Sequence, residues 1–359
     1  MPEYRDKFYN IIPKPQTRSQ RTEQAHMVKR YLVLSMGNNP TFSYYLEERL
    51  NRSAYPNDVR DLTQSLSDID PEGVFVIICR YIRPRQLQWL YRNRKRIAGA
   101  ALFIDDDLAA IFASAKGEFA YKAYITVLGI VPLLILNRVL TEVWVSTPAL
   151  GRVLAKNTKN IKVIGPLPSM LTYHSHKRKG AHSDHLVMAF HTDRCHETEH
   201  VFLLPIVKEA LRKCKNLRFE VVATGRIARM WLNADLPADR LEIRENQTWA
   251  DYLEATRESK IDIFLVPLAR NSFNDVRAGT KRIDAVRLGA AAVFSRCHVY
   301  QQNGNEEEIF VGYDSAAWVE AICQLAEDSA LRLRAHKASA RAIRCMTNAE
   351  IASPPFHIG

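Results

Sequence analysis

Residues 261–300 read IDIFLVPLARNSFNDVRAGTKRIDAVRLGAAAVFSRCHVY, and this stretch decides the fold. An apolar run ends at Pro267, and a second one, AAVFS, begins at Ala291. Both runs are short and rich in branched or aromatic side chains, which favours buried strands. The residues between them form a polar loop followed by a segment with helical spacing over 280–288. A strand, a helix and a second strand in succession predict a mostly parallel sheet.

The same alternation extends in both directions from this stretch. Apolar runs that predict strands begin at Tyr31, Val74, Ala101, Glu142, Ile161, Leu186, Leu217 and Leu241. Segments that predict helices cover 84–96, 199–214, 249–258, 315–327 and 329–344. A chain of 359 residues exceeds what one hydrophobic core usually organises. We therefore expect an α/β protein with two doubly wound, Rossmann-like domains that face each other across a cleft, because such sheets bind ligands at the carboxyl ends of their strands.

Breaks in the apolar pattern give the expected boundaries. Residues 1–30 are a polar, basic and irregular arm, and residues 31–165 form the N-terminal domain. Residues 166–185 combine prolines, histidines and a basic cluster without an apolar period, which is typical of an interdomain linker. The C-terminal domain then covers 186–345, and residues 346–359 form a tail.

Composition limits the class of protein and its partners. With 47% hydrophobic and 25% charged residues, the chain has the composition of a soluble globular protein. Its net charge of +11 favours anionic partners such as phosphates, nucleic acid or an anionic membrane surface. The six cysteines form no CxxC pair, which is typical of a reduced, cytoplasmic chain. The longest apolar stretch, 124–136, is shorter than the roughly 20 residues that a membrane-spanning helix needs.

The loop and helix that follow Pro267 carry the residues best suited to bind an anion. We expect Arg277 and Lys281 in the first turns of the helix that follows the loop, where free backbone N–H groups also favour a diphosphate. Asp284 follows Lys281 by about one turn, and its carboxylate can accept two hydrogen bonds from a ribose diol. These three residues predict a nucleotide site.

This segment resembles the donor-binding segment of retaining GT-B glycosyltransferases of family 4, also called group 1. The matching residues are Asp262, Leu265, Pro267, Leu268, Phe273, Asn274, Arg277, Lys281, Asp284, Gly289 and Val293. Four further phrases are similar to segments of the same family: FIDDDLAA at 103–110, VLTEVWVSTPALGRVL at 139–154, FHTDRCHETEHVFLLPIVKEAL at 190–211 and ENQTWADYLEA at 245–255. The resemblance covers most of residues 100–345.

The resemblance implies transfer of a sugar from a nucleoside diphosphate sugar to an acceptor hydroxyl, with retention at the anomeric carbon. It implies no metal ion and no cofactor beyond the donor, a carbohydrate or lipid-linked acceptor, and a role in polysaccharide or glycolipid biosynthesis. Its catalytic candidates are Arg277, Lys281 and Asp105, and its donor-binding candidates are Gly225, Arg226, Phe273, Asn274, Asp284 and His196. The expected location is the cytoplasm, with peripheral attachment to the cytoplasmic face of the membrane as an alternative.

Departures from the family pattern keep a second class of function open. Asp284 stands where glutamate is usual, Val276 stands where many members carry a glutamate, and no glycine follows Phe190. A GT-B-like binding or scaffold protein without catalysis fits these departures. A third alternative, nucleic-acid binding, depends on seven basic residues within 80–96, interleaved with Trp89 and Tyr91, and we do not expect it.

Two motifs have competing interpretations. Asp105, Asp106 and Asp107 can orient an acceptor hydroxyl or cap a following helix, and we assign Asp105 to the site and Asp107 to capping. The letters HETEH at 196–200 match the zinc-protease pattern H-E-x-x-H. The stretch that follows offers no third histidine and contains Pro205, so no metal site is expected there.

Overall fold

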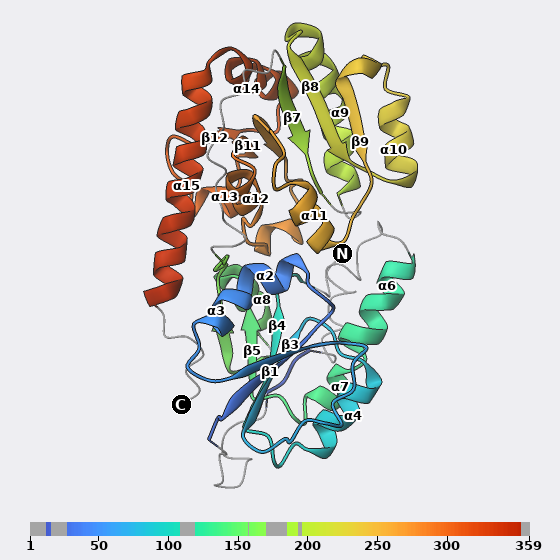
Figure 1. Ribbon diagram of the computed structural model, residues 1–359, viewed down its shortest axis with the longest axis vertical. Helices are drawn as coiled ribbons and strands as arrows, with labels where there is room; N and C mark the ends of the chain where they lie inside the picture. The colour runs from blue at the N-terminus through green and yellow to red at the C-terminus, as the bar shows by residue number, and fades with distance from the viewer. Residues whose placement is uncertain are drawn as a thin grey trace. The chain divides into compact units, whose positions relative to one another are not determined.

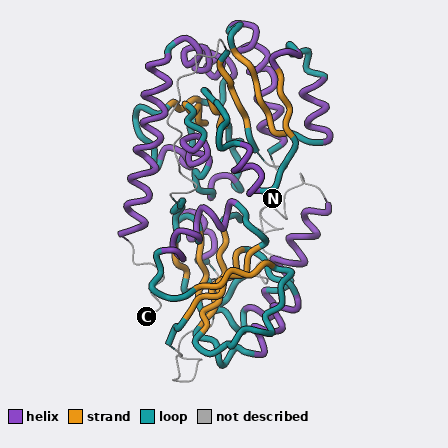
Figure 2. The backbone as a smooth tube through the Cα atoms, viewed as in Figure 1, coloured by secondary structure: helices purple, strands orange, loops and turns teal. Residues whose placement is uncertain are grey.

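The computed structural model describes residues 12–15, 27–107, 119–156, 158–169, 185–192 and 196–352. The chain forms two compact units (Figures 1 and 2). Unit 1 comprises Met1–Leu167, Asp275–Ala278 and Ala349–Gly359, and unit 2 comprises Pro168–Asn274 and Gly279–Asn348. A short piece of the loop after Pro267 therefore belongs to unit 1, although the residues on either side of it belong to unit 2.

Unit 1 contains a six-stranded parallel sheet with the strand order β2-β1-β3-β4-β5-β6. Its strands are β1 Arg30–Ser35, β2 Asn57–Asp61, β3 Val74–Cys79, β4 Gly99–Ile104, β5 Glu142–Val145 and β6 Ile161–Val163. Its helices are α2 Pro40–Tyr45, α3 Glu47–Asn51, α4 Pro84–Arg92, α6 Phe119–Ile125, the π-helix η2 Thr126–Ile130, α7 Leu133–Leu136 and α8 Pro148–Leu154. Every residue of β3 and β4 is buried, as expected for central strands covered on both faces.

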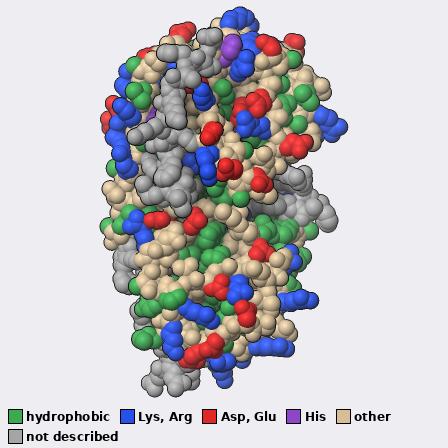
Figure 3. All heavy atoms as spheres, viewed as in Figure 1, with side chains coloured by type: hydrophobic (Ala, Val, Ile, Leu, Met, Phe, Trp, Pro, Cys, Tyr) green, Lys and Arg blue, Asp and Glu red, His purple; other side chains and the backbone are tan. Residues whose placement is uncertain are grey.

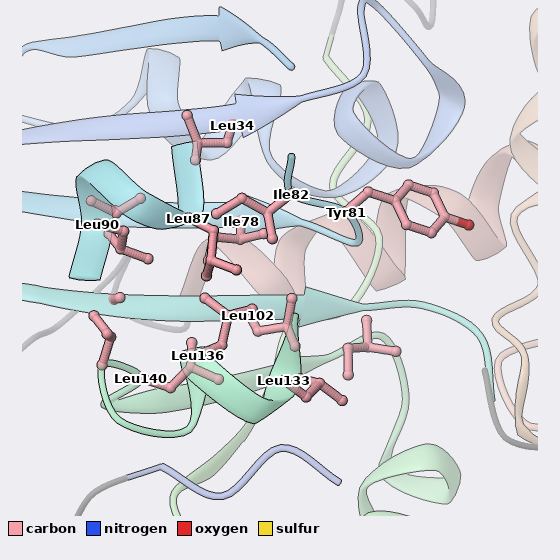
Figure 4. Close-up of a cluster of buried hydrophobic side chains, with 14 of the residues drawn as sticks. Leu34, Ile78, Tyr81, Ile82, Leu87, Leu90, Leu102, Leu133, Leu136 and Leu140 are labelled. Carbon is pink, nitrogen blue, oxygen red and sulfur yellow. The ribbon is translucent and has the colours of Figure 1, made fainter. Parts of the chain in front are cut away.

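Helices α4 and α7 pack against the same apolar core of unit 1 (Figure 4). Leu87 and Leu90 of α4 and Leu133 and Leu136 of α7 are buried there, together with strand residues such as Leu102. Pro84 begins α4, where its missing N–H costs nothing and its fixed φ suits a helix. The apolar side chains thus determine which face of each helix points inward.

Unit 2 repeats the arrangement with the strand order β12-β11-β10-β7-β8-β9, again all parallel. Its strands are β7 Leu186–Phe190, β8 Leu217–Val222, β9 Leu241–Arg244, β10 Ile263–Val266, β11 Ala291–Ser295 and β12 Ile309–Val311. Its helices are α9 Glu197–Lys213, α10 Gly225–Leu232, α11 Trp249–Ala255, α12 Lys281–Arg287, α13 His298–Gln301, α14 Ser315–Glu327 and α15 Ser329–Ala352, with short 3-10 helices η3 Ala238–Arg240 and η4 Asn274–Val276.

Both six-stranded sheets confirm the prediction of two Rossmann-like, doubly wound α/β domains. Two strands were not predicted. β2 has the polar sequence NDVRD and pairs with β1 alone among the described strands, so it lacks the apolar run of a central strand. β12 is only three residues long.

The segments outside the predicted domains have their own structure where it is described. Residues 12–15 are irregular but attached to unit 1, since the Thr158 hydroxyl donates to the Pro13 carbonyl at 2.7 Å. Helix α15 continues to Ala352, past the predicted domain end at 345, and Glu350 forms an ion pair with Arg49 in unit 1. Most of the predicted linker, 170–184, lies outside the described residues.

Candidate functional site

The carboxyl end of the unit 2 sheet holds a charged group built around Lys281. Lys281 is the first residue of α12, and its ammonium donates to the His191 carbonyl at 3.0 Å and to the Asp284 carboxylate at 3.1 Å. The His191 carbonyl directly follows β7, whereas Asp284 lies one turn along α12. The Asp284 side chain is only 4% exposed, but that of Lys281 is 35% exposed. A cation with one accessible side and two fixed acceptors is suited to meet an anionic ligand.

The His191 side chain belongs to a buried network that supports this group. Its Nε2 lies 2.7 Å from Glu220 in β8, and its Nδ1 lies 3.0 Å from the Tyr252 hydroxyl in α11. Arg244 at the end of β9 pairs with the other Glu220 oxygen at 3.0 Å. Side chains from β8 and α11 therefore hold the His191 ring, and the carbonyl of the same residue receives the Lys281 ammonium.

The protonation state of His191 follows from its partners. Burial lowers the pKa of His191, although the hydrogen bond to Glu220 opposes this shift. Glu220 accepts from His191 and Arg244, so a neutral His191 donates through Nε2 and accepts the Tyr252 hydroxyl proton at Nδ1. Burial also raises the pKa of Tyr252, which keeps its hydroxyl protonated and able to donate.

Arg287 is a buried cation near the same network in unit 2. Its guanidinium lies 5.1 Å from the centre of the Tyr252 ring and donates to the Thr256 hydroxyl at 2.7 Å. Cation–π contact and the hydroxyl acceptor hold the guanidinium against α11. Positive charge from Lys281, Arg244 and Arg287 thus gathers around the predicted nucleotide-binding helix.

A second group lies around the loop after β10. Glu199 in α9 is buried and accepts the Ala269 N–H at 3.0 Å, and its other oxygen lies 3.6 Å from His196 Nδ1. Asn274 is also buried, and its amide donates to the Ala269 carbonyl at 2.8 Å. Burial alone would raise the pKa of Glu199, but His196 and the Ala269 N–H outweigh it and lower that pKa. His196 and Asn274 are therefore connected indirectly. His196 contacts Glu199, Glu199 accepts the Ala269 N–H, and Asn274 donates to the Ala269 carbonyl.

The remaining predicted donor-binding residues of unit 2 are more exposed. Gly225 begins α10 with φ +55°, a left-handed conformation that glycine adopts without strain. Arg226 follows it, with its side chain 72% exposed, and forms an ion pair with Glu197 at the start of α9. Phe273 is half-buried in the loop before Asn274.

His200 of the HETEH motif takes part in the packing of unit 2. His200 is buried, and its Nδ1 accepts the Trp231 indole N–H at 3.0 Å, so this nitrogen is occupied. Within the described ranges, no group of three or more His, Cys, Asp or Glu side chains could hold a metal ion. Burial, aided by the nearby His196, lowers the pKa of His200 to about 4.

Acid should weaken unit 2 through His200. The unfolded chain binds a proton at this imidazole below about pH 6.5, whereas the folded chain binds it only near pH 4, so stability falls as the pH drops through this window. A shift of this size corresponds to about 3 kcal/mol. We expect His200→Gln, whose carbonyl can still accept the Trp231 indole, to lose less stability over the same window in urea titrations. Parallel pH profiles for the two proteins would contradict this assignment.

Unit 1 carries its own charged cluster at the carboxyl end of its sheet. Arg80 directly follows β3 with φ 67°, an uncommon value for a side chain other than glycine. Its guanidinium lies 3.2 Å from Asp105 and 3.4 Å from Asp106, which both follow β4. The Thr41 hydroxyl in α2 donates to Asp105 at 2.7 Å. Burial raises the pKa of Asp105, a shift that Arg80 opposes and Asp106 reinforces.

Arg277 belongs to this unit 1 cluster, not to the helix that carries Lys281. Its Nε lies 3.1 Å from Asp106, and the neighbouring Val276 carbonyl accepts the Thr147 hydroxyl at 2.6 Å. The expectation of Arg277 in the first turns of a helix was wrong, because α12 begins only at Lys281. A buried carboxylate needs a counter-charge, and Arg277 supplies it to Asp106. The predicted capping role of Asp107 concerns residues 108–118, which lie outside the described part of the chain.

Several residues of these clusters were not among the site residues that the sequence predicted. They are Thr41, Arg80 and Asp106 in unit 1, and His191, Glu199, Glu220, Arg244, Tyr252 and Arg287 in unit 2. Glu220 left a signal in the sequence, since a glutamate inside the apolar strand LRFEVV must find a partner if it is buried. The partners themselves are far apart in sequence and carry no such signal.

Three solved structures illustrate what the chain is similar to. A glycosyltransferase of Rickettsia africae superposes with a TM-score of 0.57 at 11% identity, over 92% of this chain and 100% of that one. HepE of Anabaena, solved with UDP and glucose, gives a TM-score of 0.55 at 12% identity, over 90% and 98%. TarM of S. aureus gives 0.56 at 13% identity, over 80% of this chain and 55% of TarM. This chain thus matches just over half of the length of TarM.

These similarities define the class of fold. At such low identity they establish the GT-B architecture and nothing finer, in agreement with the two Rossmann-like units. No family model matches the sequence, and no curated protein matches it significantly. None of the helices within the described residues is long and apolar enough to cross a membrane.

Proposed function

We propose that this protein is a retaining glycosyltransferase of family 4 that transfers a sugar from a nucleoside diphosphate sugar to an acceptor hydroxyl. The observation that carries the proposal is the position of Lys281, half-exposed at the start of α12 and held by Asp284 and the His191 carbonyl. Transfer breaks the bond between the anomeric carbon and the diphosphate, and negative charge develops on the departing oxygen. A fixed ammonium at this place stabilises that charge.

The other candidate residues receive proposed roles on the same basis. Arg277 and Asp105 of the unit 1 cluster are the other proposed catalytic residues, Arg277 as a cation and Asp105 to orient the acceptor hydroxyl. Asn274 and His196 shape the donor loop through Ala269 and Glu199, while Asp284, Phe273, Gly225 and Arg226 contact the donor. The reaction is proposed to need no metal ion or cofactor beyond the donor.

We propose UDP as the nucleotide of the donor, because HepE and TarM were both solved with UDP. The proposed acceptor is a carbohydrate or a lipid-linked sugar, used in polysaccharide or glycolipid biosynthesis at the cytoplasmic face of the membrane. The net charge of +11 supports an anionic surface as a partner.

Thermal unfolding in the presence of nucleotides tests the donor site. A ligand at a hundred times its dissociation constant adds about 2.7 kcal/mol of stability, which raises the unfolding midpoint by several degrees. We expect UDP and UDP-sugars to raise the midpoint more than ADP or GDP do, and we expect Lys281→Ala to lose this rise. Lys260→Ala is the matched control, because Lys260 is an exposed lysine outside both clusters.

A turnover assay beside the unfolding experiment separates an active enzyme from a binding protein. A nucleotide-dependent rise together with hydrolysis or transfer of a UDP-sugar supports catalysis, whereas a rise without any turnover favours the scaffold alternative. The donor site is wrong if no nucleotide changes the midpoint, or if the rise is the same in Lys281→Ala.

A further inference from the structure

One helical segment of unit 1 is apolar on both faces. Across η2 and α7, the inner side chains Ile130, Leu133 and Leu136 are buried in the core. The outer side chains are exposed: Val127 by 56%, Val131 by 48%, Leu134 by 60% and Ile135 by 41%. The spacing of these four positions places them along one stripe. A surface helix normally carries polar residues at such positions. An exposed apolar stripe of this kind marks an interaction site.

Basic residues flank this stripe. Helix α4 packs beside α7 (Figure 1) and buries Leu87 and Leu90, while Arg83, Arg85 and Arg92 are exposed. Arg138 is exposed just after α7. The sequence contains no Asp or Glu in 73–104 or in 119–141. We call these eight residues the α4–α7 face: Arg83, Arg85, Arg92, Val127, Val131, Leu134, Ile135 and Arg138.

We propose that the α4–α7 face docks onto an anionic lipid surface. The four aliphatic side chains enter the boundary between head groups and acyl chains, and the arginines contact the lipid phosphates. Arginine suits this role because its planar guanidinium binds phosphate through two parallel hydrogen bonds. The inference deepens the proposed function by naming the surface through which the enzyme would reach a lipid-linked acceptor.

The chemistry of the face favours lipid over other partners. In a symmetric contact between two copies, the same patch meets itself, which brings arginines of both copies together. Single-stranded nucleic acid binds on aromatic side chains that stack with its bases. Trp89 and Tyr91 of α4 are half-buried against the core, and the exposed apolar residues of the face are aliphatic. The aliphatic stripe and its arginines together match only a surface that is both apolar and anionic. Figure 3 shows the mixed distribution of charge over the face of the molecule in that view.

Vesicle sedimentation tests the proposal without any need for turnover. We expect the full chain to sediment with vesicles of phosphatidylcholine and phosphatidylglycerol in equal parts, and much less with phosphatidylcholine alone. Added salt should weaken binding without abolishing it, because the arginine contribution is screened and the aliphatic contribution is not.

Matched variants separate the apolar and charged contributions. Val127→Ser and Leu134→Ser are each expected to lower the vesicle partition coefficient about tenfold. Their controls are Val201→Ser and Leu232→Ser in unit 2, whose side chains are 56% and 66% exposed. Arg85→Gln is expected to lower it about fivefold. Its control is Arg218→Gln, since Arg218 is an exposed residue of β8.

Several outcomes would overturn the proposal. The first is the absence of sedimentation with either kind of vesicle, and the second is an equal loss of binding in the test and control variants. The third is a dimer that Val127→Ser dissociates. The fourth is binding to nucleic acid, but not to lipid, that Arg85→Gln weakens. An unchanged unfolding midpoint shows that each variant is folded. The nucleotide-dependent rise reports the donor site separately, so failure of lipid binding and failure of the proposed activity give different results.

Discussion

Lys281→Ala is expected to lower kcat for sugar transfer by a factor of about 10² to 10³, the usual cost of removing one preorganised donor to a developing negative charge. The ammonium is already placed by two acceptors, so it needs no rearrangement as charge develops on the diphosphate. Lys281→Arg keeps the charge but not its compact shape, and should restore only part of the rate. Steady-state kinetics with UDP-sugars, chosen by the nucleotide that stabilises the protein, measure the effect.

A loss of rate must be separated from a loss of structure. Removing Lys281 leaves the buried Asp284 carboxylate without this partner, which itself costs stability. The double variant Lys281→Met/Asp284→Asn removes both charges and should fold better than Lys281→Ala while remaining inactive. Lys260→Ala should retain the rate of the unaltered protein. Full activity in the double variant would exclude Lys281 from catalysis.

The second large effect concerns the ion pair between Arg282 and Glu308. Arg282 Nε lies 2.7 Å from Glu308, and the two side chains are 3% and 0% exposed. Arg282 also donates to the Tyr300 carbonyl at 2.6 Å, and Glu308 accepts the Ser339 hydroxyl at 2.7 Å. Arg282→Met is therefore expected to destabilise unit 2 by about 3–5 kcal/mol, because it leaves a buried carboxylate uncompensated. Urea unfolding measures this cost.

Two comparisons give this prediction its controls. The double variant Arg282→Met/Glu308→Leu removes both charges and should recover much of the lost stability, since well-packed apolar residues can replace a buried ion pair. Arg257→Met breaks an exposed pair with Glu254, in which both side chains are 68% exposed, and should leave the midpoint nearly unchanged. Equal destabilisation by Arg282→Met and Arg257→Met would contradict the argument.

The position of this ion pair connects stability with function. Arg282 follows Lys281 in α12, so the same helix that presents the ammonium is anchored through its buried face. The i and i+3 spacing of Lys281 and Asp284 puts them on one side of α12, as the sequence predicted. Only the structure identifies Glu308 as the partner of Arg282. Glu308 lies in a polar stretch, NGNEEEIF, whose sequence does not indicate which of the three glutamates is buried.

The sequence by itself determined the two α/β units and most of their elements. Central strands such as β3, VFVIIC, are buried along their whole length. Each is therefore a continuous apolar run that can be recognised without knowing which strands lie beside it. Edge strands such as β2 have one partner and a polar composition, and only pairing with β1 identifies them. Strand and helix signals are local, since they arise from the period of side chains along one segment.

Tertiary structure decided which charged groups meet. Arg277 was predicted beside Lys281 because the two are close in sequence. Its ion-pair partner is instead Asp106, which is far away along the chain but belongs to unit 1, as Arg277 does. His191, Glu220 and Tyr252 likewise come together from three elements. A buried charge must find a counter-charge or a hydrogen-bond partner wherever the fold provides one. The spacing of side chains along one segment therefore predicts helices and strands. The partners in the site follow from the cost of desolvating a charge, which must be compensated by groups from any part of the folded chain.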